Sequence, residues 1–164
     1  MMSFWRAYYH LVWATRNRRP LIDAKLEPVL FSYLEKKAGE FSVIIYAVNG
    51  VEDHIHLVAA IPPRFAVAEV VKALKGGSSH YLNHYGHSAD FEWQRGYGVF
   101  TLGERHLPDA IAYVLAQKEH HRVGKTNVWL ERVDEVDHGP TMPPTRIREQ
   151  GVVYHIIKQD EWPF

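Results

Sequence analysis

The sequence predicts an α+β fold of the ferredoxin-like (RRM-like) type, an antiparallel sheet with helices packed on one of its faces. Three observations predict it. Strand-like and helix-like segments follow one another in the order β-α-β-β-α-β-α, two adjacent strands are joined by a short turn, and 164 residues, of which 46% are hydrophobic, are enough for one core. The last helix of the series is expected near the other face of the sheet.

Side-chain periodicity and turn residues predict the elements of the first half. Residues 4–15 are rich in aromatic side chains, which favour strands. Residues 23–37 carry apolar side chains at the three- and four-residue spacing of a helix, with Asp23 as a candidate N-cap. Residues 41–50 and 54–61 are apolar runs joined through the turn residues of "NGVED", and therefore predict a hairpin.

The second half alternates in the same way. Residues 66–75 predict an amphipathic helix, which the small residues of "GGSS" are expected to break or loosen. Residues 96–103 predict a fourth short strand, and residues 108–121 predict a third helix with a proline in its first turn. Residues 151–158 could add one more strand.

The composition limits the classes of protein that are possible. Nineteen basic residues balance nineteen acidic ones, which argues against a histone-like or tail-driven binder but permits a basic face. The absence of cysteine excludes disulfides and thiolate metal sites. No segment resembles a signal peptide or a membrane span, so we expect a soluble cytoplasmic protein with no membrane partner. We expect one domain over residues 1–164, with a core at about 4–123 and a C-terminal extension, 124–164, of open role.

Two histidines stand one residue apart in the predicted strand 54–61. Because side chains alternate along a strand, His54 and His56 share a face and lie close enough to bind one metal ion, while Ile55 and Leu57 point the other way. A histidine pair of this spacing is often incidental. Two ligands also leave a metal site incomplete, so a third ligand has to be found.

The predicted helix 108–121 offers that ligand and a nucleophile. Tyr113, Gln117 and His120 lie about one turn apart, roughly opposite an apolar stripe of Ile111, Val114 and Leu115. A tyrosine, with its ordinary pKa of about 10, is a poor nucleophile by itself. Beside a cation that polarises a phosphodiester, it can attack phosphorus. A surface tyrosine and a solvated glutamine remain the alternative for this helix taken alone.

Five segments in matching order resemble the HUH single-tyrosine transposases of bacterial insertion sequences (the insertion sequence 200/605 class). The resemblance covers roughly residues 4–123. It includes the family's His-hydrophobic-His motif, its Lys-Gly-x-Ser-Ser segment, and a helix in which a tyrosine is followed four residues later by a glutamine. The segments are "YHLVWATRNRRPL", "EDHIHLVAAIPP", "VVKALKGGSSHYL", "WQRGYGVFTLG" and "AIAYVLAQKEHH".

The resemblance implies a metal-dependent transposase that acts on single-stranded DNA. Tyr113 would form a 5′-phosphotyrosine link and release a 3′-hydroxyl, so rejoining needs no nucleoside triphosphate. His54, His56 and Gln117 would bind Mg²⁺ or Mn²⁺, although magnesium prefers oxygen ligands. The family acts as a homodimer on DNA hairpins at element ends, in which the nucleophile helix can serve the active site of its own subunit or of the partner.

Other residues are candidates for contacts to DNA or for support of the site. The basic loop "RNRRP" and the residues around "GGSS" could contact phosphates. Two rings on the sheet face could stack on bases, and further polar groups could orient the histidines or the tyrosine. A solvated loop, a flexible helix end, a dimer contact or a turn is the alternative reading in each case. The DNA candidates are Arg16, Arg18, Arg19, Lys72, Lys75, Ser78, Tyr8 and His10, and the supporting candidates are Asp53, His120 and His121.

Two other functions compete with the transposase. A repurposed relative would bind structured single-stranded nucleic acid without cutting it, and would not need Tyr113 or Gln117. An unrelated metal hydrolase would need a carboxylate near the histidines to activate water, and only Glu52 and Asp53 are close in sequence. A hydrolase would tolerate Tyr113→Phe, whereas a transposase of this class would not.

Overall fold

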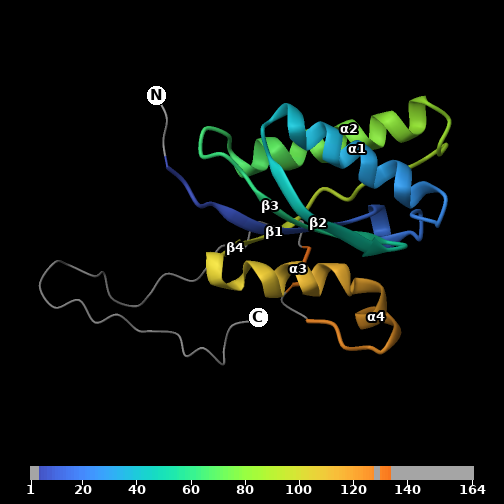
Figure 1. Ribbon diagram of the computed structural model, residues 1–164. Coiled ribbons are helices and arrows are strands. Elements are labelled where there is room, and N and C mark those ends of the chain that lie inside the picture. Colours follow the sequence, from blue (N-terminus) through green and yellow to red (C-terminus); the bar gives the residue numbers. More distant parts are fainter. Residues whose placement is uncertain (1–3, 128–129, 134–164) are drawn as a thin grey trace, which may run out of the picture.

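The computed structural model describes residues 4–127 and 130–133. Its centre is a four-stranded antiparallel sheet with the strand order β2-β3-β1-β4, which confirms the predicted ferredoxin-like α+β arrangement (Figure 1). The strands are β1 (Tyr8–Ala14), β2 (Ile44–Val51), β3 (His54–Ala60) and β4 (Gly98–Leu102). The hairpin predicted for the second and third strands is present.

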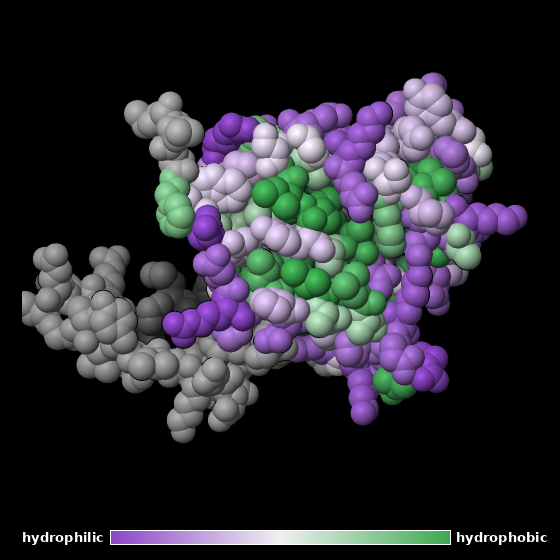
Figure 2. Space-filling view, in the orientation of Figure 1, coloured by the Kyte–Doolittle hydropathy of each residue, from purple (hydrophilic) through white to green (hydrophobic). Residues whose placement is uncertain are grey.

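Helices cover both faces of the sheet (Figure 1). The first pair lies on one face, and the second pair, which follows β4 in the chain, lies against β2 and β3 on the other face. The helices are α1 (Leu26–Glu40), α2 (Val67–His84), α3 (Leu107–Leu115) and α4 (Gln117–Arg122), with short 3-10 turns at Arg16–Arg18 and Glu104–His106. Hydrophobic side chains gather in the middle of the surface shown in Figure 2, with hydrophilic ones around them.

Alternate residues of β3 face different layers, as predicted. Ile55 and Leu57 belong to the main core beneath α1 and α2, whereas Val58 belongs to a smaller apolar cluster under α3. His54 and His56 have the same parity as Val58, so they face α3. All residues of β3 are buried, so the second face of the sheet, near which the last helix was expected, is covered as well.

Helix α2 is longer than predicted, because "GGSS" does not break it. The helix continues through Gly76 and Gly77 to His84. A side chain on Gly77 would begin 2.5 Å from the hydroxyl oxygen of Tyr33 on α1, so this glycine lets the two helices approach. Packing between α1 and α2 thus offsets the low helix propensity of glycine.

The third predicted helix is divided in two. The backbone angles of Ala116, φ −88° and ψ 8°, lie outside the helical range, which separates α3 from α4. The faces also differ from the prediction, because Leu115 is 59% exposed and Gln117 is fully buried. Val114 belongs to the apolar contact as predicted, and Ala110 joins it. At 100° per residue, Ala110, Val114 and Gln117 lie on one side of the helix, so the buried side is rotated by about a quarter turn from the stripe that the sequence suggested.

The predicted N-cap of α1 is confirmed, since Asp23 accepts hydrogen bonds from the N–H groups of Lys25 and Leu26 at 2.9 and 2.8 Å. The strand predicted at 151–158 lies outside the described residues. Within the described ranges, no helix is long and apolar enough to cross a membrane.

Candidate metal and nucleophile site

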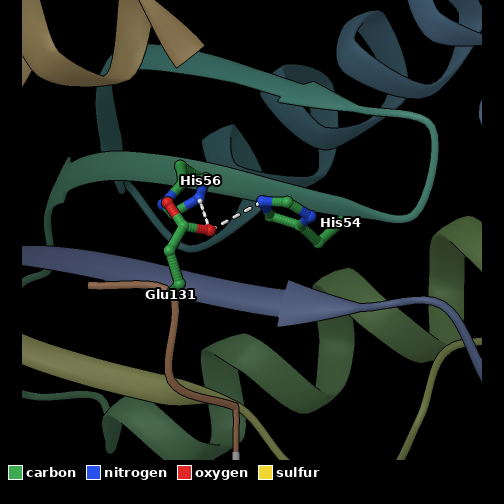
Figure 3. Close-up of side chains that lie close together, drawn as sticks. All are labelled: His54, His56 and Glu131. Carbon is green, nitrogen blue, oxygen red and sulfur yellow. Dashed lines mark hydrogen bonds and ion pairs between the residues drawn. The ribbon is translucent and has the colours of Figure 1, made fainter. Parts of the chain in front are cut away.

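The two strand histidines converge on one carboxylate. The Nε2 atoms of His54 and His56 lie 2.9 and 3.2 Å from the same oxygen, Oε2 of Glu131 (Figure 3). Both imidazoles are buried, with 1% and 0% of the side chains exposed. The structure therefore brings together the predicted pair and adds an acidic group that the sequence analysis did not identify.

A second polar group fixes each ring from behind. Nδ1 of His54 donates to Asp53 at 2.6 Å, and Arg18 donates to the other oxygen of Asp53 at 3.2 Å. Nδ1 of His56 lies 2.9 Å from Nε2 of His10, and the two rings are stacked. Partners of this kind hold a ligand ring in one orientation and direct its other nitrogen outward. Asp53 thus has the supporting position that the sequence suggested.

The charges at the site are mutually dependent. Burial alone would lower the pKa of His54, but the carboxylates of Asp53 and Glu131 outweigh burial and raise it. For His56 the effect of burial is larger than that of the Glu131 carboxylate, so the pKa of this histidine is lowered. Burial also lowers the pKa of His10 to about 3. The histidines in turn outweigh the effect of burial on Glu131 and hold its pKa far below the usual range, so this carboxyl group is ionised.

Tyr113 reaches the same carboxylate from α3. Its hydroxyl donates to Oε1 of Glu131 at 3.1 Å and accepts a hydrogen bond from the N–H of Asn127 at 3.1 Å. Burial and the charge of Glu131 raise the pKa of the phenol, and the N–H of Asn127 opposes them. The ring stacks on His120 and meets the edge of His56. The predicted nucleophile and the histidine pair therefore belong to one site within one chain.

Gln117 begins α4, directly after the break at Ala116. Its side chain is fully buried, and its amide nitrogen and oxygen make no hydrogen bond to the described part of the chain, although the amide is close enough to Tyr113 to lower the pKa of the phenol. Leaving a buried polar group without a partner costs about 1–3 kcal/mol. Such a group calls for a ligand, a bound ion or water.

The two histidines of α4 lie at the edge of the site. His120 stacks on Tyr113 with 4.8 Å between ring centroids. His121 is 30% exposed, its Nε2 lies 3.6 Å from Glu131, and its ring is 4.8 Å from that of His54. Both therefore occupy positions from which they could orient the tyrosine or a bound strand.

Two of the predicted phosphate contacts are buried in the fold instead. The ammonium of Lys75 donates to the backbone carbonyls of Gln94, Arg95 and Gly96 at 2.7, 3.1 and 2.7 Å, and only 9% of the residue is exposed. Ser78 is fully buried and accepts a hydrogen bond from the indole N–H of Trp93. The lysine and serine of this motif fasten residues 91–96 to α2, so a direct DNA contact is not available to them here.

The predicted base-stacking rings are also inside the protein. Tyr8 is 8% exposed and donates to Glu104, and His10 is fully buried behind His56. Because the sheet face is covered by α3, neither ring is presented to a nucleobase. His10 instead supports His56.

The other basic candidates remain at the surface. Arg16, Arg18 and Arg19 pair with Glu92, Asp53 and Asp90, and each arginine side chain stays between 44% and 58% exposed. Lys72 is exposed on α2. Because surface ion pairs contribute little, a phosphate can compete for these groups.

Lys75 leads to a prediction about stability. Burial lowers the pKa of Lys75 to about 8 from an ordinary 10.5. Between these two pH values the unfolded chain binds more protons than the folded chain, so the free energy of unfolding rises with pH. Lys75→Met removes this titration. We expect the stability of the wild type relative to Lys75→Met, from urea unfolding, to increase over that interval. The exposed Lys72→Met is the control, and a pH-independent difference would contradict the assignment.

Sequence reasoning missed Glu131 because it lies 75 residues from His56, in a segment with weak periodicity. One signal was available, since two imidazoles and an amide are a poor match for magnesium and call for another oxygen ligand. The same segment supplies the N–H of Asn127 to Tyr113.

Comparisons with known proteins place this chain among transposases of insertion sequences. The family model described as "Transposase IS200 like" matches residues 3–117. The transposase of insertion sequence element IS200 from Salmonella typhimurium is 30% identical over 127 residues, which cover 74% of this chain and 83% of that protein. The ISDra2 transposase TnpA of Deinococcus radiodurans is 30% identical over 74 residues, 45% of this chain and 53% of that protein.

Two solved structures share the fold. One, described as a candidate transposase from Deinococcus radiodurans R1, has a TM-score of 0.57 and 23% identity, covering 76% of this chain and 95% of that one. The other is a REP-associated tyrosine transposase bound to a REP hairpin, with a TM-score of 0.55 and 15% identity, covering 76% of both chains. From the matched family model and the Salmonella relative, we conclude that the chain belongs to the IS200-like transposase family.

Proposed function

We propose that the chain is a metal-dependent transposase that cuts and rejoins single-stranded DNA through a 5′-phosphotyrosine link on Tyr113. One observation carries the proposal. A single carboxylate, Glu131, bonds the phenol of Tyr113 through one oxygen and both strand histidines through the other. A nucleophile and a pair of metal-ligand side chains thus meet at one point.

The residues fit a divalent metal ion. The Nε2 atoms of His54 and His56 face a common carboxylate oxygen, and the amide of Gln117, beside Tyr113, is buried with no hydrogen bond to the described part of the chain. We propose that these three residues hold Mg²⁺ or Mn²⁺. When bound, the ion would polarise the scissile phosphate and offset its negative charge.

The chain's own residues would then carry the transfer. The hydroxyl oxygen of Tyr113 attacks phosphorus and loses its proton, the bond from phosphorus to the 3′ oxygen breaks, and that oxygen leaves as a 3′-hydroxyl after taking up a proton. Attack by a 3′-hydroxyl on the phosphotyrosine reverses these steps and frees Tyr113. The exchange conserves the phosphoester bond, so no nucleoside triphosphate is needed.

The proposed partner is a hairpin in single-stranded DNA at the ends of an element. The similar structure that holds a REP hairpin supports a hairpin partner, and Arg16, Arg18, Arg19 and Lys72 offer exposed cations for its phosphates. A homodimer remains a prediction. The site described above supports catalysis within a subunit, since Tyr113 lies beside the histidines of its own chain.

The test uses the full chain and labelled single strands from both flanks of its own gene. With Mn²⁺ we expect a covalent protein–DNA product that survives denaturation, and peptide mapping should place the nucleotide on Tyr113. With the metal chelated, the product should be lost. Hairpin binding with no covalent product under any metal would support the repurposed binding protein instead.

A further inference from the structure

We infer that Glu131 is a ligand of the divalent metal and the residue that positions Tyr113 relative to it. This inference rests on the proposed function. Oε2 of Glu131 lies 2.9 and 3.2 Å from the two histidine Nε2 atoms. Neighbouring ligand atoms of an octahedral ion with bonds of about 2.1 Å lie about 3 Å apart. The carboxylate oxygen already has this spacing to each of the two nitrogens.

The surroundings of Glu131 favour a cation over a simple ion pair. The side chain is only 14% exposed, and a buried carboxylate is costly without a positive partner. Nδ1 of His54 is bonded to Asp53 and Nδ1 of His56 to His10, so the Nε2 atoms are the free coordinating positions. A neutral imidazole that donates through Nδ1 has a lone pair at Nε2, so a cation bound here would take the place of the protons that the two Nε2 atoms otherwise share with the carboxylate.

A carboxylate ligand also resolves the mismatch of ligand chemistry. Two imidazoles and an amide would favour zinc, nickel or copper, whereas carboxylate oxygens suit magnesium and manganese. Glu131 adds one hard, charged oxygen to the set. We therefore expect it to contribute more to the affinity for manganese than to that for nickel.

The second oxygen of Glu131 gives the residue its positioning role. Oε1 accepts the hydrogen bond from Tyr113, so the carboxylate links the phenol to the metal site through its two oxygens. Its part is to hold the phenol at a fixed place beside the ion.

The test measures metal binding directly, without DNA or activity. Mn²⁺ is titrated into the full chain, and the free ion is followed by electron paramagnetic resonance. Glu131→Gln keeps the size and the acceptor for Tyr113 but removes the charge. We expect its Mn²⁺ affinity to fall at least about tenfold, the lower end of the effect of losing a partner behind a ligand. Its Ni²⁺ affinity, measured by calorimetry, should fall less.

Two further variants make the result interpretable. Glu52→Gln removes an exposed carboxylate two residues from His54 and should bind Mn²⁺ like the wild type. Glu131→Asp keeps the charge and should bind Mn²⁺ more tightly than Glu131→Gln, which separates loss of a ligand from loss of folding. Circular dichroism confirms that each titrated variant is folded.

The outcomes separate this inference from the proposed function. If the wild type and Glu131→Gln bind Mn²⁺ equally while His56→Ala binds it weakly, the role of Glu131 is refuted and the histidine site stands. If the wild type itself binds no divalent ion, the metal-dependent mechanism fails as well.

Discussion

Tyr113→Phe is expected to abolish the covalent protein–DNA product while leaving DNA binding intact. The substitution removes only the hydroxyl oxygen, which lies between Glu131 and the N–H of Asn127. Loss of a covalent nucleophile removes most of the rate enhancement, so we expect adduct formation to fall at least about a thousandfold. Denaturing gels with labelled single strands and Mn²⁺ measure this directly.

Tyr46→Phe is the matched control for this experiment. Tyr46 lies on β2, its ring meets that of Tyr8, and it is 39% exposed. It should form the adduct like the wild type. Metal-dependent cleavage that persists in Tyr113→Phe would point to a metal hydrolase, for which Glu131 now offers a carboxylate beside the histidines.

The sheet and the histidine pair were predictable because they depend on local patterns. Strict alternation along β3 decides that His54 and His56 share the face of Val58, and the pairing of strands keeps that alternation in register. Tyr113 was likewise identified from the spacing of its helix and from the resemblance to a family. These features can be predicted from the spacing of residues that are close together in the sequence.

What the sequence did not reveal depends on contacts between distant segments. Helix α2 continues through Gly77 because Tyr33, on another helix, occupies the space of the absent side chain. Lys75 and Ser78 resemble surface phosphate ligands until residues 91–96 cover them. These predictions were wrong for the same reason: the polarity of a short segment does not indicate which distant part of the chain will pack against it.

The candidate site shows both what the sequence could predict and what it could not. Gln117 was selected correctly as a residue near Tyr113, but it was expected on the polar side of its helix, whereas its side chain lies in the interior on the same side as Ala110 and Val114. Glu131 could not be placed, because no repeat or motif links it to β3. The arrangement of the histidines could be predicted, and the carboxylate that joins them to the tyrosine could not.

The second large effect is expected from His56→Ala. This change removes the Nε2 atom that faces Glu131 and the Nδ1 atom bonded to His10, and takes away one of the two rings stacked on His10. Since a proposed ligand is lost, not merely a group behind one, we expect the affinity for Mn²⁺ to fall by at least about a hundredfold. Metal-dependent adduct formation should fall with it.

Three measurements distinguish this result from simple unfolding. Circular dichroism and urea unfolding report the fold, and binding of labelled hairpin DNA in the absence of metal should match the wild type, because the exposed arginines are unchanged. His84→Ala removes an exposed imidazole on α2 and should alter neither metal affinity nor adduct yield. Normal Mn²⁺ affinity in a folded His56→Ala protein would show that the histidine pair only supports the sheet, because a ligand cannot be deleted without weakening the ion it holds.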